Sequence, residues 1–200
     1  MSLQAAHTWV ALVHYPVYDR NHKVVATALT NLDLHDIARS VRTYNLAGYL
    51  IVHPVAAQRE LASRIAGHWT GDRGAPGAPK NDFRRMAVER VQVVASLADA
   101  AAFVAEAEGS QPTLISTAAR PSPDARGYDD IRNSLSGPAL LVLGTGWGLT
   151  EDALAACAYR LAPVEALRTT PTTADDPGYN HLSVRSACAI ILDRLYGDRK

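Results

Sequence analysis

Segments rich in apolar residues alternate with segments of helical periodicity along the 200-residue chain. Short apolar runs are typical of strands buried on both faces of a sheet, and we predict strands over 9–15, 48–54, 90–94, 112–119, 137–144 and 159–164. Apolar residues at helical spacing predict helices over 31–45, 56–69, 97–109, 150–158 and 181–197. This alternation predicts an α/β fold, a parallel sheet with helices on both faces.

One stretch, 70–82, is rich in glycine and proline and is predicted to be a loop. Predicted strands lie on both sides of it, so we expect the loop to lie within a domain and not between two domains. A length of 200 residues suits one domain. We therefore predict a single domain over residues 1–200.

Three glycines at alternate positions follow the most apolar predicted strand, in LLVLGTGWGLTED over 140–152. Ligands of open parallel sheets bind at the carboxyl ends of strands, so this position favours a ligand-binding loop. The alternative is a tight turn in which a glycine adopts positive φ. Neither GxxxxGK(S/T) nor GxGxxG is present, and Glu151 and Asp152 in the next helix would repel a phosphate. A neutral or cationic ligand fits better, such as adenosine attached to a sulfonium.

A cluster of polar residues opens the helix predicted over 31–45. Asn31, Asp33, Asp36 and Arg39 gather there, and the last three are spaced to share much of one helix face. Such a cluster can serve a ligand. It can equally be a helix cap with acidic first-turn residues and a surface ion pair, and the residues alone leave both interpretations open.

A third feature precedes the C-terminal helix. Asn180 is a suitable N-cap for that helix, and His181 and Arg185 lie one turn apart, where they could reach a ligand or lie in solvent. The seven histidines form no HxxxH or HExxH pair, so we expect no metal site.

These blocks, in this order, resemble the SPOUT superfamily of S-adenosylmethionine-dependent RNA methyltransferases. The resemblance covers essentially the whole chain, through LVHYPVYDRNHKVVATALTNLDLHDIARSVRTY, HPVAAQRELASRIAGHW, LLVLGTGWGLTED and YNHLSVRSACAIILDRL. The most similar family is a small one of SAM-dependent RNA methyltransferases that also occurs fused to tRNA guanine-N1 methyltransferases. The resemblance implies an α/β fold with a trefoil knot in the C-terminal part, a homodimer, and S-adenosylmethionine as cofactor. Apolar Ile190, Ile191, Leu192 and Leu195 on the last helix also favour the homodimer.

The resemblance implies site residues as well. In related ribose methyltransferases an Asn and an Arg of the first motif serve the acceptor, and here they match Asn31 and Arg39. Three loops hold the cofactor, the last of them over 161–183; the matching residues are Ser116, Thr117, Ala118, Leu143, Gly144, Thr145, Gly146, Trp147, Gly148, Leu149, Leu161, Pro163, Tyr179, Asn180, His181, Leu182 and Ser183. Two motifs depart from the superfamily pattern. GTGWGLTED stands where other SPOUT enzymes have Pro-Glu-Gly, and NHLSVRSA replaces the usual third motif.

The charged residues point to a partner only in one local region of the chain. Basic and acidic residues balance at 20 each, so the net charge indicates neither a nucleic acid nor a membrane partner. An RNA-binding surface must then come from a local excess of basic residues, which occurs over 59–90. We expect RNA contacts from Arg59, Arg64, Arg84 and Arg85, and the alternative is a solvated helix face.

Cys157 and Cys188 lie in apolar contexts without CxxC spacing, which is typical of buried free thiols in a reducing cytosol. The N-terminus lacks the basic region of a signal peptide, and no apolar run is long enough to span a bilayer. We therefore expect a cytoplasmic protein with no membrane partner.

These features together predict an S-adenosylmethionine-dependent RNA methyltransferase that acts on tRNA. The pairing of Asn31 with Arg39 is nearer to the ribose-modifying branch, so the ribose 2′-hydroxyl is favoured over a base nitrogen. One alternative is a catalytically silent SPOUT protein that binds the cofactor and RNA. Another is a nucleotide-binding α/β module of a different class.

Overall fold

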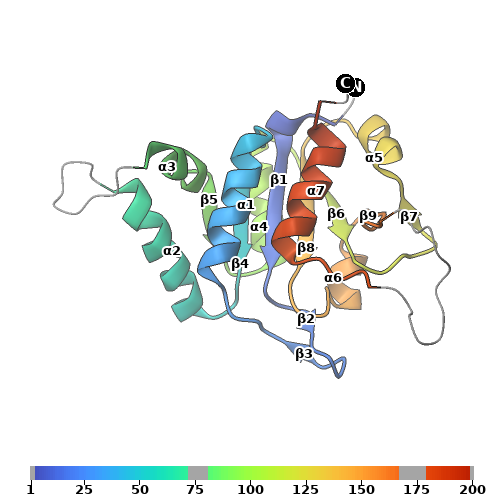
Figure 1. Cartoon of the computed structure of the whole chain (residues 1–200), viewed down its shortest axis with the longest axis horizontal. Helices are drawn as coiled ribbons and strands as arrows, with labels where there is room; N and C mark the ends of the chain where they lie inside the picture. Colours follow the sequence, from blue (N-terminus) through green and yellow to red (C-terminus); the bar gives the residue numbers. More distant parts are fainter. Residues whose placement is uncertain (1–2, 72–80, 167–178, 199–200) are drawn as a thin grey trace.

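A parallel sheet forms the centre of the computed structural model, which describes residues 3–71, 81–166 and 179–198 (Figure 1). Within these residues the sheet has seven strands. In spatial order they are β5 (Val91–Val94), β4 (Gly48–Val52), β1 (Thr8–Val13), β8 (Ala139–Gly144), β6 (Thr113–Thr117), β9 (Tyr159–Leu161) and β7 (Ala125–Arg126). Neighbouring strands are parallel throughout, as the alternation of strands and helices predicts.

β8 lies at the middle of the sheet, between β1 and β6, although it follows both in the chain. Its residues 139–143 are buried, and the same holds for all of β1 and β4. Burial on both faces explains why these strands are apolar without interruption. The trefoil knot that the resemblance implies stays a prediction.

Helices cover both faces of the sheet. They are α1 (Asn31–Thr43), α2 (Ala56–Thr70), α3 (Asp82–Val88), α4 (Leu97–Glu108), α5 (Tyr128–Ser134), α6 (Glu151–Ala155) and α7 (Val184–Tyr196), after a short 3-10 turn at Ala5–His7. α1 and α7 lie side by side over one face, and α4 and α6 lie over the other (Figure 1). Successive strand residues point to opposite faces, so Val10 and Leu12 pack with α1 and α7, whereas Ala11 and Val13 pack with α4 and α6.

The predicted strands and helices all occur, with ends that differ by a few residues. Five short features of the described residues were not predicted: the 3-10 turn at Ala5–His7, α3, α5, strand β7 and a hairpin after β1. The predicted loop over 70–82 is shorter than expected at both ends, because α2 includes Thr70 and α3 begins at Asp82. Residues 72–80 of that loop lie outside the described residues.

The start of α7 differs from the prediction. Ser183, not Asn180, caps this helix, because the Ser183 hydroxyl accepts a hydrogen bond from the Ser186 amide at 3.2 Å. Asn180 lies in the non-helical stretch before the cap, and its side-chain amide donates to the Ala119 carbonyl at 3.1 Å. Asn180 therefore joins two loops instead of starting a helix.

The connection from β1 to α1 contains a β-hairpin. Strand β2 (Val17–Tyr18) pairs antiparallel with β3 (Val24–Val25). The hairpin projects beyond the carboxyl edge of the sheet (Figure 1). Val17 also forms an antiparallel bridge with Leu149, so the hairpin adjoins the glycine loop that follows β8.

Candidate functional site

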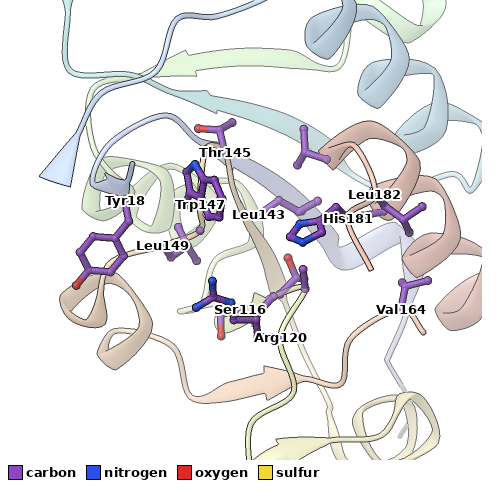
Figure 2. A pocket seen from close by; sticks show the side chains of 18 of the residues that line it. Tyr18, Ser116, Arg120, Leu143, Thr145, Trp147, Leu149, Val164, His181 and Leu182 are labelled. Carbon is purple, nitrogen blue, oxygen red and sulfur yellow. The ribbon is translucent and has the colours of Figure 1, made fainter. Parts of the chain in front are cut away.

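A cleft of about 1350 Å³ opens at the carboxyl ends of three neighbouring strands (Figure 2). Its lining includes Ser116 at the end of β6, Leu143 at the end of β8 and Leu161 at the end of β9. The segment before α7 contributes residues 180–183. The cleft therefore lies where open parallel sheets bind ligands, as the position of the glycine loop predicts.

Most of the residues predicted to bind the cofactor line this cleft. They are Ser116, Thr117, Ala118, Leu143, Gly144, Thr145, Gly146, Trp147, Gly148, Leu149, Leu161, Asn180, His181, Leu182 and Ser183. Pro163 and Tyr179 are not among the lining residues. Residues 167–178 of the predicted third loop lie outside the described residues. The structure thus brings parts of all three predicted loops to one cleft, and each residue's contact with the cofactor stays a prediction.

The protein's own packing requires glycine in the loop after β8. Gly146 and Gly148 have φ values of 61° and 105°, which other residues rarely adopt. A Cβ atom at Gly146 would lie 2.8 Å from the Tyr18 carbonyl oxygen, and one at Gly144 would lie 2.8 Å from the Leu149 amide nitrogen. The sequence left open a ligand-binding loop or a tight glycine turn. Both interpretations apply, because the tight turn also lines the cleft.

Backbone hydrogen bonds fasten the hairpin to this loop. The Tyr18 amide donates to the Gly148 carbonyl, and the Trp147 amide donates to the Tyr18 carbonyl, both at 2.9 Å. The hairpin thereby brings Tyr18 and His22 into the lining of the cleft, and Thr27, which follows the hairpin, lines it as well. These residues were not predicted, because two-residue strands leave no clear pattern in the sequence.

Side-chain hydroxyls connect the glycine loop to the end of β1. Thr145 Oγ1 lies 3.1 Å from the Val13 carbonyl oxygen and 2.5 Å from Thr27 Oγ1, which lies 3.0 Å from His14 Nδ1. Because Thr145 donates its one hydroxyl proton to Val13, it accepts from Thr27. Thr27 then accepts from the Nδ1–H of His14. This chain of hydrogen bonds assigns the Nδ1–H tautomer to His14 and leaves its Nε2 unprotonated.

Two buried histidines stand directly after β1 and β4. The rings of His14 and His53 stack with centroids 5.4 Å apart. His53 accepts from the Val55 amide at Nδ1 and donates from Nε2 to the Thr27 carbonyl, at 3.1 and 2.9 Å. Burial lowers the pKa of both histidines, and that of His14 falls to about 4 because His53 adds to the effect. Both rings are therefore neutral at pH 7, and Nε2 of His14 has no hydrogen-bond partner among the described residues.

The polar cluster at the start of α1 includes one residue of the cleft. Asp33 is only 7% exposed and lines the cleft. Its carboxylate accepts from the Thr30 hydroxyl at 2.6 Å and lies 3.5 Å from the Arg185 guanidinium. Arg185 also lies 3.4 Å from the Asp36 carboxylate. Arg185 is thus held by two carboxylates of α1 and is not among the residues that line the cleft, whereas His181 is.

Asn31 and Arg39 lie outside this arrangement. Both are exposed, and neither is among the residues that line the cleft. Asn31 is the first residue of α1, which Thr30 caps by accepting from the amide of Asp33 at 3.1 Å. A single chain therefore brings Asp33 to the cleft and leaves both predicted acceptor residues away from it. Their catalytic role stays a prediction.

The arginines predicted to bind RNA lie on α2 and α3, near the β5 edge of the sheet (Figure 1). Arg59 donates to a backbone carbonyl just after β4 at 2.9 Å, and Arg84 lies over an indole ring, 4.6 Å from its centroid. Arg85 forms an ion pair one helical turn away at 2.8 Å, and Arg64 is exposed. Contact of these arginines with RNA stays a prediction.

Both cysteines are free, as predicted. Cys188 is buried and Cys157 is half-buried, and burial raises their thiol pKa values to about 12 and about 11. In the part of the chain that the structure describes, no three His, Cys, Asp or Glu side chains are grouped to hold a metal ion. The same part contains no helix of sufficient length and apolar character to cross a membrane.

The chemistry of the lining suits a nucleoside. Leu143, Leu149 and Leu161 provide apolar walls of the kind that pack against an adenine ring. Asp33 and Glu151 place carboxylates in the same lining, beside the guanidinium groups of Arg185 and Arg160 at 3.5 and 3.8 Å. The apolar walls therefore fit the adenosine of the ligand class that the glycine loop predicts, and the lining carries charges of both signs.

Comparisons with known proteins agree with this chemistry. Residues 7–197 match a family model described as SAM-dependent RNA methyltransferase. The tRNA (guanine-N(1)-)-methyltransferase of Oleidesulfovibrio alaskensis is 41% identical over 191 residues, which cover 95% of this chain and 42% of the relative. The chain thus spans less than half the length of this curated relative.

Solved structures share the fold. A probable methylase family protein from Haemophilus influenzae Rd KW20 matches with a TM-score of 0.56 at 16% identity, over 96% of this chain and 66% of that chain. The SpoU methyltransferase AviRb from Streptomyces viridochromogenes, solved with the cofactor AdoMet, matches with a TM-score of 0.52 at 13% identity, over 97% and 58% of the two chains. The chain therefore shares the fold of these methyltransferases. The chain belongs to the family of SAM-dependent RNA methyltransferases, whose cofactor is S-adenosylmethionine.

Proposed function

We propose that this methyltransferase acts on tRNA in the cytoplasm and methylates a ribose 2′-hydroxyl. The cleft at the carboxyl ends of β6, β8 and β9, in a chain that matches the family over residues 7–197, is the observation that carries RNA methylation. The names of two curated relatives, both tRNA (guanine-N(1)-)-methyltransferases, support tRNA as the substrate. This chain covers 42% of each, so their guanine-N1 activity belongs to longer proteins. The ribose acceptor is supported by the match of Asn31 and Arg39 to the ribose-modifying branch.

Bound S-adenosylmethionine supplies an activated methyl group. The leucines of the cleft and the glycine loop are placed to hold its adenosine, and the carboxylate of Asp33 is placed to favour its positive charge. The protein's remaining tasks are to position the acceptor hydroxyl and to accept its proton. We assign the carboxylate of Asp33 to the part of the cleft where the acceptor hydroxyl binds, because contacts with Arg185 and Thr30 hold it at the cleft.

A second copy of the chain completes the acceptor site in this proposal. Arg39 is exposed on α1 and does not line the cleft of its own chain. In a two-fold dimer, the partner chain can place its Arg39 at the cleft of the first chain. A residue that lies outside the site of its own chain can lie inside the site of the partner chain.

The apolar surface for such a dimer differs from the sequence-based expectation. Ile191, Leu192 and Leu195 of α7 are buried inside the chain, so they leave little surface for a partner. Exposed leucines at the first turn of α1 and just before α7, Leu32 and Leu182, supply apolar surface near the same pair of helices. Light scattering that gives a monomer mass at micromolar concentration would exclude the dimer.

A catalytically silent binding protein is the second candidate. One observation favours it: neither Asn31 nor Arg39 lines the cleft of the single chain. Such a protein would bind S-adenosylmethionine and RNA without transferring the methyl group.

The experiment that separates these proposals is methyl transfer from labelled S-adenosylmethionine to unmodified tRNA transcripts. Ribose methylation yields alkali-resistant dinucleotides, because a methylated 2′-oxygen cannot attack the neighbouring phosphate. Base methylation yields a labelled mononucleotide instead. Labelled, alkali-resistant dinucleotides support the proposal. Label in a mononucleotide shows that the acceptor is a base and corrects the proposal. Binding of S-adenosylmethionine without methyl transfer indicates the silent protein. Nucleoside mass spectrometry on RNA from a deletion strain and its parent would then identify the position.

A further inference from the structure

The hairpin after β1 has a well-formed tip. The Asp19 amide donates to the Lys23 carbonyl at 2.9 Å, and the Asp19 carboxylate accepts from the backbone amides of Asn21 and Lys23, at 2.8 and 2.9 Å. His22, at the turn, has a φ of 56°. The carboxylate of Asp19 is therefore occupied by the backbone, and it defines the turn on which the basic side chains of Arg20 and Lys23 are exposed.

The tip is rigidly joined to the rim of the cleft. Its Tyr18 exchanges backbone hydrogen bonds with Trp147 and Gly148 of the glycine loop, and the Tyr18 carbonyl occupies the space that a Cβ at Gly146 would need. Hairpin and glycine loop therefore form one backbone-bonded unit at the mouth of the cleft.

An exposed aromatic ring stands on this unit. Trp147 is 56% exposed, although it lines the cleft and its backbone is held by hydrogen bonds. Tyr18 and His22 line the same cleft, with ring centroids 5.7 Å apart. Figure 2 shows Trp147 and Arg120 around one opening, with Tyr18 beyond the indole. A solvent-facing indole, whose backbone is bonded to a hairpin that carries exposed Arg20 and Lys23, is suited to stack on a nucleobase while the cations contact phosphates.

We propose that the hairpin tip and Trp147 form the docking surface for a single-stranded segment of the RNA substrate. Trp147 stacks on an unpaired base at the mouth of the cleft, and Arg20 and Lys23 contact the adjoining phosphates. This proposal rests on RNA methylation as the proposed function. The cleft has room for it: pockets for one small ligand measure roughly 300 to 1,000 Å³, and this one measures about 1350 Å³, which leaves space beside a nucleoside cofactor.

Fluorescence anisotropy tests the surface directly. The probes are a labelled 12-nucleotide single-stranded RNA of mixed sequence and the duplex of the same strand, with saturating S-adenosylhomocysteine. Arg20→Ala/Lys23→Ala lowers affinity for the single strand about tenfold and lowers its log–log salt slope by roughly 0.7 per lost phosphate contact. Trp147→Ala lowers single-strand affinity about tenfold but leaves duplex affinity unchanged, because only an unpaired base presents a free face. Trp147→Phe, which keeps an aromatic face, restores most of the binding.

Two further variants locate the effect. Arg42→Ala removes a cation from the far end of α1 and is expected to leave RNA affinity within about twofold. Arg64→Ala/Arg85→Ala tests the other basic surface, on α2 and α3. The proposal is overturned if Arg64→Ala/Arg85→Ala loses more RNA affinity than the hairpin variant. It is also overturned if RNA affinity is unchanged in both Arg20→Ala/Lys23→Ala and Trp147→Ala.

The cofactor is measured separately by calorimetry with S-adenosylmethionine. If Trp147→Ala loses cofactor binding and keeps RNA binding, the indole serves the cofactor and the docking surface is wrong. If the unaltered protein binds RNA through the hairpin but neither binds S-adenosylmethionine nor methylates tRNA, the proposed function fails and the docking surface stands. Thermal unfolding of Trp147→Ala and Arg20→Ala/Lys23→Ala confirms that each variant is folded.

Discussion

The hydroxyl oxygens of Thr27 and Thr145 lie 2.5 Å apart, so one hydrogen bond joins the β1–α1 connection to the glycine loop of the cleft. Thr27 belongs to the segment that also carries the hairpin, and Thr145 is flanked by two of the three glycines. Behind this pair lies His14, whose Nδ1–H is satisfied by Thr27. The shape of the cleft therefore depends on a polar chain that ends in the buried interior.

Removal of the Thr145 hydroxyl tests this dependence. Thr145→Val keeps the shape of the side chain but leaves the Thr27 hydroxyl proton without its acceptor, and we expect the free energy of unfolding to fall by about 1–3 kcal/mol. Affinity for S-adenosylmethionine should fall as well, because the loop loses its side-chain hydrogen bond to Thr27 and keeps only its backbone bonds to the hairpin. Urea unfolding and calorimetry measure the two effects. Thr145→Ser is the matched control, since it keeps the hydroxyl, and equal stability of all three proteins would refute the coupling.

Stability should depend on pH through His14. Its pKa is about 4 in the folded chain, against 6.5 for an unperturbed histidine, because it is buried beside His53. The unfolded chain therefore takes up a proton first as the pH falls. The stabilisation is complete above pH 6.5 and decreases toward pH 4, by up to about 1.4 kcal/mol per pH unit. Chemical unfolding at several pH values should show a shallower slope for His14→Asn, which retains a donor near Nδ1 but cannot titrate; an identical slope would contradict the assignment.

Two glycines should respond in opposite ways to the same substitution. At Gly146 a Cβ would lie 2.8 Å from the Tyr18 carbonyl and φ is positive, so Gly146→Ala should cost about 1–3 kcal/mol of stability and displace the hairpin. At Gly67, inside α2, a Cβ would meet nothing within 4 Å, and Gly67→Ala should stabilise by about 0.5–1 kcal/mol. Thermal unfolding of both variants checks the pair. A loss of cofactor binding in Gly146→Ala would reflect the displaced hairpin as much as contact with the ligand.

The sequence predicted the fold where burial leaves a strong pattern. Strands such as β1 and β8 are almost entirely apolar because helices cover both of their faces. α3 and α5 have only seven residues each, too few turns for a helical period to stand out. The hairpin strands have two residues each, and backbone bonds to the glycine loop position them, which no local pattern records.

The candidate site was predictable to the same extent. Three alternate glycines after a buried strand located the cleft, because position and composition both favoured a ligand loop. Tyr18, His22 and Thr27 were missed since they reach the cleft only through the hairpin. His14 and His53 had a signal that could have found them: each follows a buried strand and stands two residues or one residue before a proline, in VHYP and VHP. Neighbouring parallel strands then bring the two rings together.

Arg39 provides the decisive test of catalysis. It is exposed on α1 and lies outside the cleft of its own chain, so Arg39→Ala should not disturb the core or the cofactor loops. If a partner chain presents it to the acceptor, Arg39→Ala abolishes methyl transfer to tRNA while affinity for S-adenosylmethionine changes by less than about threefold. Arg39→Lys should fail too, because a lysine ammonium cannot reproduce the planar fork of a guanidinium. Arg42→Ala, one turn further along the same helix, should leave transfer intact. Methylation that persists in Arg39→Ala would remove the catalytic assignment and leave Asp33, the residue that the structure does bring to the cleft, as the group to test next.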